Sequence, residues 1–186
     1  AWHLVRGGRF LRREEHSALL AEALAAAESS RRRQRDGLRV VIEGAFCEQP
    51  PVELLETLEV AGCFIVDDDL QLGRRWFGAD IDFRGDPLED LARGFLEHSA
   101  STSICHGKAP RAESLLARVR RARAEGVVFC AAKFCEPALF DYPLLRAAME
   151  KEGIPYLCFE FEEKMSVFES VRSQAETFVE SSLFFA

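Results

Sequence analysis

The sequence predicts an α/β fold in three layers, with a mainly parallel sheet of four strands between helices. Three observations carry this prediction. Short apolar runs recur along the chain, segments with helical spacing alternate with them, and glycine, proline or acidic residues separate the two. Such alternation is typical of a parallel sheet covered on both faces and joined by right-handed crossovers. The 186 residues, 48% of them hydrophobic, suffice for one domain plus an appendage.

The first predicted element is a helix over Glu14–Arg33, rich in Ala and Leu. We expect residues 1–37 to form a helical connector and residues 38–186 to form the α/β domain. The chain begins with Ala1, which suggests a fragment or a processed chain. Asp36 and Gly37 form a turn signal, and Leu38–Glu43 (LRVVIE) predicts the first strand.

The remaining elements are predicted from the same two signals, short apolar runs for strands and helical spacing of apolar residues for helices. One strongly amphipathic segment carries Leu115, Leu116 and Val119 on its apolar side, and Gly153 ends the helix before the last strand. The predicted elements are helix Val52–Val60, strand Gly62–Val66, helix Pro87–His98, helix Pro110–Ala124, a strand from Val127, helix Tyr142–Glu152, strand Ile154–Phe161 and helix Ser166–Phe184. For four parallel strands we expect a flavodoxin-like or Rossmann-like order, 2-1-3-4.

Composition narrows the function classes. The net charge of −7 argues against nucleic-acid binding, which depends on Lys and Arg neutralising phosphates. No apolar run approaches the roughly 20 residues that span a bilayer, and the N-terminus lacks the apolar segment of a secretory signal, so we expect no membrane association and a cytoplasmic location. Neither GxGxxG nor GxxxxGK[ST] occurs at a strand-to-helix turn, so dinucleotide binding and nucleotide hydrolysis have no support.

The six cysteines fall into two groups. Three lie within apolar strand-like runs, where reduced core thiols are usual: Cys63, Cys130 and Cys158. Three others follow predicted strands or lie in loops: Cys47, Cys105 and Cys135. No CxxC pair occurs, so a self-contained zinc or ferredoxin-type site is not predicted. The second group can converge only if the preceding strands end at one edge of the sheet.

Cys135 has the most informative position. It follows the apolar strand and precedes Pro137, which suits the first turn of a helix because proline lacks an N–H. Ligands of open α/β sheets bind outside the carboxyl ends of the strands, and the positive end of a helix favours a thiolate. From the residues alone Cys135 is a nucleophile, a metal ligand or an inert thiol.

Three segments at the predicted strand ends resemble a known family. They are GAFCEQPP, VDDDLQLGRRWF and FCAAKFCEPALFDYP. The first is similar to the iron–sulfur subunits of ATP-dependent (class I) benzoyl-CoA reductase, of the B/C type, and the other two recur across the 2-hydroxyacyl-CoA dehydratase family to which those subunits belong. The resemblance covers nearly all of residues 38–186, including the last strand and the region of Arg172 and Glu176.

The resemblance implies an oxygen-sensitive protein with a [4Fe–4S] cluster, for which Cys135 of the KFCEP motif is a ligand. It implies a homologous second catalytic subunit, an ATP-hydrolysing activator that supplies a low-potential electron, and an aryl- or acyl-CoA thioester as substrate. In the reductase branch the aromatic ring is reduced to a cyclic diene. In the dehydratase branch a ketyl radical expels a hydroxyl group. A non-catalytic scaffold or binding domain is the third alternative.

The resemblance implies that the other cysteine ligands lie in a preceding domain, which we expect to be absent from this sequence. A cubane needs thiolates or substitutes at several irons. We therefore expect the 186-residue chain to fold but to be inactive alone and to hold no intact cluster.

Two further residues are candidates for the cluster and its chemistry. Cys47, at a turn stiffened by Pro50 and Pro51, is a second candidate for cofactor binding. His106, adjacent to Cys105, is a candidate iron ligand or proton donor, and its alternative is a solvated loop histidine.

Lys133 is a candidate for lowering the thiolate pKa of Cys135, or for stabilising negative charge on the cluster or on a reduced substrate carbonyl. Its alternative is a surface lysine that pairs with Glu136. Arg74 and Trp76 offer forked donors and a stacking face to the phosphates and adenine of CoA. Their alternative is pairing with the run Asp67–Asp69. Consecutive carboxylates in an extended segment point in alternating directions, so we expect helix capping or a hydrogen bond to the following arginines rather than a metal site.

Overall fold

The computed structural model describes residues 2–30, 36–44, 50–70, 80–98, 111–162 and 164–184. The chain divides into two compact units, Ala1–Arg35 and Asp36–Ala186. The first contains α1 (Trp2–Gly7) and α2 (Arg13–Ser29). The start of α2 agrees with the helix predicted from Glu14, but α2 ends at Ser29 rather than at Arg33, and α1 was not predicted. His16 Nε2 donates a hydrogen bond to the carbonyl oxygen of Leu4 at 2.8 Å, which ties α2 to α1.

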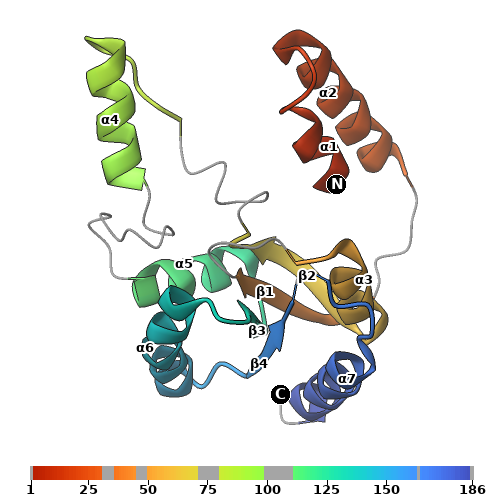
Figure 1. The fold of residues 1–186 in the computed structure, drawn as a ribbon. Coiled ribbons are helices and arrows are strands. Elements are labelled where there is room, and N and C mark those ends of the chain that lie inside the picture. Colours follow the sequence, from red (N-terminus) through yellow and green to blue (C-terminus); the bar gives the residue numbers. More distant parts are fainter. Residues whose placement is uncertain are drawn as a thin grey trace. The chain divides into compact units, whose positions relative to one another are not determined.

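The second unit is built on a four-stranded sheet with the order β2-β1-β3-β4, in which all neighbours are parallel (Figure 1). The strands are β1 (Leu38–Gly44), β2 (Cys63–Asp68), β3 (Gly126–Ala132) and β4 (Tyr156–Phe161). Val41 of β1 is in register with Val127 of β3, and Val128 with Leu157 of β4. The predicted class and strand order are confirmed.

Helices cover both faces of the sheet. The helices of this unit are α3 (Val52–Val60), α4 (Pro87–His98), α5 (Arg111–Ala122), α6 (Glu136–Glu152) and α7 (Glu169–Phe184). α3 packs against α7, and α5 packs against α6 on the other face (Figure 1). The bounds of α3 and α4 are those predicted. α6 begins at Glu136 rather than at the predicted Tyr142. Pro137 lies in its first turn, as its place after Cys135 predicts, and Pro143 lies within the helix without ending it.

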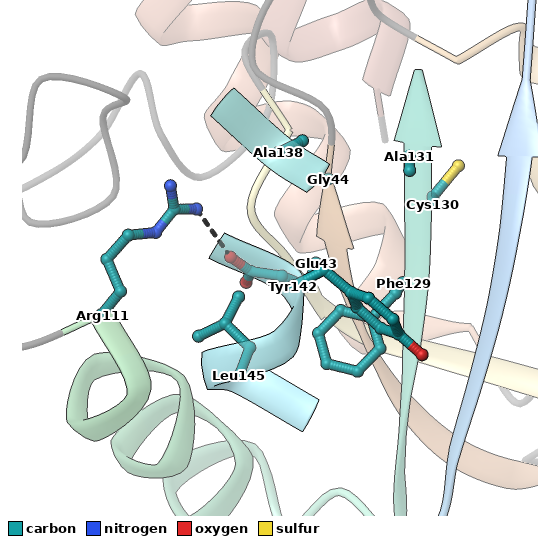
Figure 2. Close-up of a pocket in the computed structure, with 9 residues that line it drawn as sticks. All are labelled: Glu43, Gly44, Arg111, Phe129, Cys130, Ala131, Ala138, Tyr142 and Leu145. Atoms are coloured by element: carbon teal, nitrogen blue, oxygen red, sulfur yellow. Dashed lines mark hydrogen bonds and ion pairs between the residues drawn. The ribbon is translucent and has the colours of Figure 1, made fainter. Parts of the chain in front are cut away.

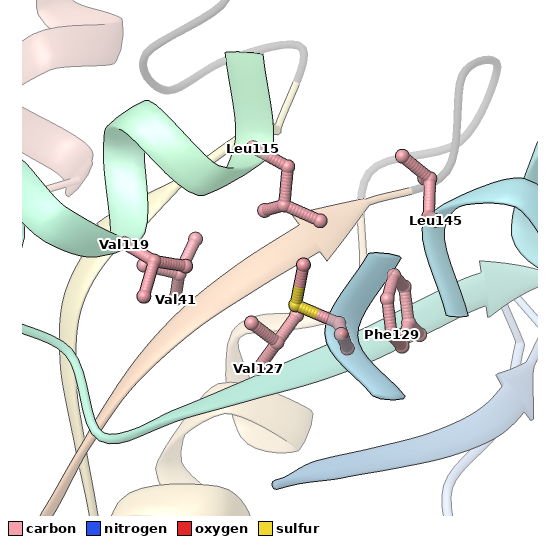
Figure 3. Packing of buried hydrophobic residues seen from close by; sticks show 7 residues of the cluster. Val41, Leu115, Val119, Val127, Phe129 and Leu145 are labelled. Carbon is pink, nitrogen blue, oxygen red and sulfur yellow. The ribbon is translucent and has the colours of Figure 1, made fainter. Parts of the chain in front are cut away.

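The core on the α5–α6 face is a cluster of buried apolar side chains from the two central strands and the two helices (Figure 3). Its members are Val41, Leu115, Val119, Val127, Phe129, Leu145 and Met149. The rings of Phe129 and Tyr142 meet edge to face with centroids 5.1 Å apart. This packing attaches α6 to β3 over the middle and end of the helix.

The strand order places a topological switch point between β1 and β3, because the chain leaves β1 toward β2 on one side and reaches β3 on the other. In open α/β sheets ligands bind in the crevice at the carboxyl ends of the two strands that flank such a point. In the described ranges no helix combines the length and the apolar character needed to cross a bilayer.

Candidate functional site

Cys135 lies at the carboxyl end of β3 and is the N-cap residue of α6. Its N–H donates to the carbonyl oxygen of Ala132 at 3.1 Å, and its own carbonyl accepts from the N–H of Leu139 at 3.1 Å. Only 3% of Cys135 is exposed. The preceding Phe134 has φ of 65°, a left-handed conformation that costs a residue other than glycine about 1–2 kcal/mol. A strained turn therefore holds the cysteine at the positive end of α6.

A small cavity lies at the switch point, bordered by the last residues of β1, by β3 and by α6 (Figure 2). Its volume of about 20 Å³ has room for a single water molecule. The lining residues are Glu43, Gly44, Arg111, Phe129, Cys130, Ala131, Ala138, Tyr142 and Leu145. Burial raises the pKa of Tyr142 to about 12, so this phenol stays protonated at neutral pH.

A buried ionic network surrounds Glu43 at the end of β1. Arg111, at the start of α5, donates from Nη2 to Glu43 Oε1 at 3.0 Å (Figure 2), and Arg118 of the same helix donates to Glu43 Oε2. The other terminal nitrogen of Arg111 donates to Asp141 of α6. Asp69, just after β2, lies 3.7 Å from Arg111 Nη2. The network thus joins β1, β2, α5 and α6 at the switch-point edge.

The charges of this network stabilise one another. Burial alone would raise the pKa of Glu43, but the guanidinium groups of Arg118 and Arg111 outweigh it and hold the pKa below its ordinary value. Burial alone would lower the pKa of Arg118, and Glu43 and Asp69 reverse that effect. Within the described part of the chain, Arg118 Nε and Nη1 are buried without a hydrogen-bond partner. Burial alone would lower the pKa of Arg111, but Glu43, Asp141 and Asp69 raise it. Glu43 and Arg111 are therefore both charged at neutral pH.

Lys133 lies on the β4 side of the same edge. Its Nζ donates to Glu162 Oε1 at 2.6 Å, so the predicted alternative pair with Glu136 is wrong. Its main-chain N–H donates to the carbonyl oxygen of Phe161 at 2.9 Å, which fixes the turn after β3 to the end of β4. The pKa of Lys133 is raised mainly by its hydrogen bond to Glu162. The lysine lines an open hollow of about 350 Å³ with Glu160, Phe161, Glu162 and Met165.

Several predicted site residues lie outside the described residues: Cys47, Arg74, Trp76, Cys105 and His106. Of the aspartate run, Asp67 Oδ2 accepts from Arg121 at 3.1 Å, and Asp68 Oδ1 accepts from the N–H of Leu70 at 3.0 Å. Arg121, which contacts Asp67, and Arg111, which lies 3.7 Å from Asp69, belong to α5, whereas the following arginines Arg74 and Arg75 lie outside the described residues. The predicted core cysteines are free thiols, of which Cys63 and Cys130 are buried and Cys158 is half-buried.

The network of Glu43, Arg111 and Arg118 was not predicted from the sequence, although a signal was present. Arg111 and Arg118 occur at helical spacing with Leu115, on the inward face of an amphipathic helix. Glu43 ends an otherwise apolar strand. Buried charges require charged or hydrogen-bonded partners, so a carboxylate at a strand end and inward-facing arginines predict each other.

The donor chemistry at this edge fits a cluster only in part. Cys135 offers a thiolate ligand at a helix N-terminus, which suits iron. No group of three or more His, Cys, Asp or Glu side chains able to hold a metal ion lies in the described ranges. Any cluster bound here would therefore need ligands beyond those ranges.

The fold and this edge define a Rossmann-like α/β domain that places a buried cysteine at the switch point of its parallel sheet. The chain belongs to the 2-hydroxyglutaryl-CoA dehydratase, D-component family, whose model matches residues 1–182. The resemblance inferred from the strand-end segments is thereby confirmed.

Known relatives are similar to the chain over nearly its whole length. The chain is 39% identical to a benzoyl-CoA reductase subunit of Thauera aromatica, over 96% of this chain and 47% of the relative. It is 30% identical to lactoyl-CoA dehydratase subunit beta of Anaerotignum propionicum, over 95% and 47%. It is 25% identical to (R)-2-hydroxyglutaryl-CoA dehydratase subunit beta of Acidaminococcus fermentans, over 96% and 48%. The chain spans about half the length of these relatives.

Proposed function

We propose that this chain is part of an iron–sulfur subunit that reduces the aromatic ring of benzoyl-CoA or a related aryl-CoA thioester. The observation that carries the proposal is the 39% identity to a benzoyl-CoA reductase subunit, against 30% and 25% for dehydratase subunits. The relatives are named as subunits, which supports work in a complex with a homologous second subunit. The electron would come from an ATP-hydrolysing activator, and the assembly would be cytoplasmic.

Cys135 is the proposed ligand in the described part of the chain, with Cys47 as the second candidate. A bound [4Fe–4S] cluster would supply single electrons of low potential to the thioester. This chain would present the Cys135 sulfur at the start of α6, in a turn that keeps the residue buried. Burial at this point excludes water and oxygen from the sulfur.

The remaining proposed roles concern the substrate. Arg74 and Trp76 would bind the phosphates and the adenine of CoA through forked donors and a stacking face. His106 would deliver a proton to the reduced ring or carbonyl. Each role is separable by substitution, because loss of CoA binding raises KM whereas loss of the proton donor lowers kcat.

Lys133 is proposed to stabilise negative charge that develops on the reduced substrate. In the complete, assembled enzyme, Lys133→Met should lower kcat by about 100-fold, the usual effect of removing one charge-stabilising donor. Glu162→Gln is the matched control, because it removes the partner of Lys133 and leaves the lysine in place. Normal turnover by Lys133→Met would remove the lysine from the mechanism.

The experiment that tests the function uses the complete protein with its partner subunit, isolated without oxygen and supplied with ATP and reduced activator. Conversion of benzoyl-CoA to a cyclic diene is the expected result. Dehydration of a 2-hydroxyacyl-CoA with no ring reduction would assign the chain to the dehydratase branch, for which the match to lactoyl-CoA dehydratase is the supporting observation. Absence of both reactions would leave the scaffold alternative.

A further inference from the structure

The start of α6, which carries Cys135, has little apolar packing of its own. Residues 136–144 are all described, and none of them is fully buried. Phe140 is 80% exposed and Leu144 is 59% exposed, and the first fully buried side chain of the helix is Leu145. Apolar contact with the core therefore fixes the helix from Tyr142 onward, where the Tyr142 ring meets that of Phe129, and leaves residues 136–141 to be held by other interactions.

One interaction that supplies this hold is the ion pair of Asp141 with Arg111. Arg111 is 10% exposed at the side chain, and its planar fork meets Asp141 with one nitrogen and Glu43 with the other. A bidentate guanidinium fixes both distance and orientation between its partners, which a lysine cannot do. Glu43 is itself fixed in β1, next to Gly44 at the switch point.

We infer that Arg111 is a positioning residue that sets Cys135 against the carboxyl end of β1, through Asp141 on α6 and Glu43 on β1. The inference rests on the proposed function, because it gives Cys135 a reason to be held in one place. Arg111 does not touch the thiol in this account. It removes the freedom of the first turns of α6, so the strained turn at Phe134 presents the sulfur in one orientation.

The test measures the accessibility of the Cys135 thiol in the complete protein after iron has been removed by chelation under reducing conditions. Iodoacetamide is the probe, and modification of the Cys135 and Cys63 peptides is followed by mass spectrometry. Cys63 is 4% exposed in β2 and reports opening of the sheet as a whole. We expect Arg111→Met to speed alkylation of Cys135 by at least about tenfold, with Cys63 unchanged. Arg111→Lys, which keeps the charge and loses the fork, should give a smaller increase.

The matched control is Arg120→Met. Arg120 Nη2 lies 2.8 Å from Glu152 Oε2, so this variant also removes an ion pair between α5 and α6, near the other ends of the helices. It should leave the Cys135 rate unchanged. If Arg111→Met does not fold, Asp141→Asn decides, because it spares the contact of Arg111 with Glu43. An unchanged Cys135 rate in the folded variants, an equal rise in Arg120→Met, or a parallel rise for Cys63 would overturn the inference.

A second readout separates this inference from the proposed function. Cluster spectra of the iron-loaded complete protein should change shape in Arg111→Met while iron is retained. If Cys135→Ala retains its iron and its unaltered spectrum, the proposed ligand role fails, and the alkylation result still decides whether Arg111 positions the thiol.

Discussion

Glu43 is a carboxylate that the sheet buries to 5% exposure and that two arginines keep ionised. Burial raises the pKa of Glu43, but the charges of Arg118 and Arg111 lower it by more, so its pKa in the folded chain is below the ordinary value. A group of this kind stabilises the fold at pH values above its unfolded pKa. That stabilisation is lost as the pH falls through the folded pKa, because the unfolded chain then binds the proton first.

Glu43→Gln should therefore destabilise the chain by about 3–5 kcal/mol at neutral pH, since it removes the carboxylate that two buried guanidinium groups share. The difference in unfolding free energy between this variant and the unsubstituted chain should become smaller as the pH falls below about 4.3, the ordinary pKa of glutamate. Urea unfolding across this pH range measures both effects. Glu180→Gln, at an exposed site on α7, serves as the control. A difference that stays constant with pH would contradict the assignment.

At the level of single residues, the position of Cys135 can be predicted from the sequence, whereas the ion pairs around it cannot. Pro137 and the apolar run before the cysteine locate it at a strand-to-helix turn. Glu43 and Arg111 lie 68 positions apart in the chain, so their contact depends on strand order and helix register that no local pattern encodes. The same holds for Lys133 and Glu162, because β4 brings Glu162 to the lysine and the sequence neighbour Glu136 turns away into α6.

At the level of elements, the periodic segments are predictable because burial on one face leaves its spacing in the sequence. α3 and α4 have the predicted bounds, and the sheet has the predicted order. α6 was predicted to begin late because its first turns expose apolar residues such as Phe140, which removes the amphipathic pattern. At the N-terminus, two helices replace one, since α1 ends where Gly7 and Gly8 interrupt the helical pattern.

α6 also offers a direct measure of what attaches it to the sheet. Leu145 is 3% exposed within the core cluster, and its neighbour Leu144 is 59% exposed. Leu145→Ala should cost about 2–5 kcal/mol of folding free energy, because it removes buried methyl groups and leaves a cavity. Leu144→Ala should change the stability by no more than about 0.5 kcal/mol. Equal effects in denaturant titrations of the two variants would show that α6 packs through a different face.

At the level of the whole molecule, the described residues form a four-stranded parallel sheet with helices on both faces, and the chain spans about half the length of its relatives. The core supports folding of the 186-residue chain, whereas Cys135 is a single proposed ligand in the described ranges. We predict that the purified chain unfolds cooperatively and holds no intact cluster. Anaerobic reconstitution followed by iron and sulfide analysis tests this, and a yield of four irons and four sulfides per chain would contradict it.

The most direct test of the ligand role of Cys135 is Mössbauer spectroscopy, with iron analysis, of the complete protein purified without oxygen. Cys135→Ala is compared with Cys63→Ala, which removes another buried thiol far from the strand-to-helix turn. Cys135→Ala should lose most of its iron and the spectrum of a [4Fe–4S] cluster, while Cys63→Ala should keep both. Retention of a full, unaltered cluster by Cys135→Ala would contradict the ligand role.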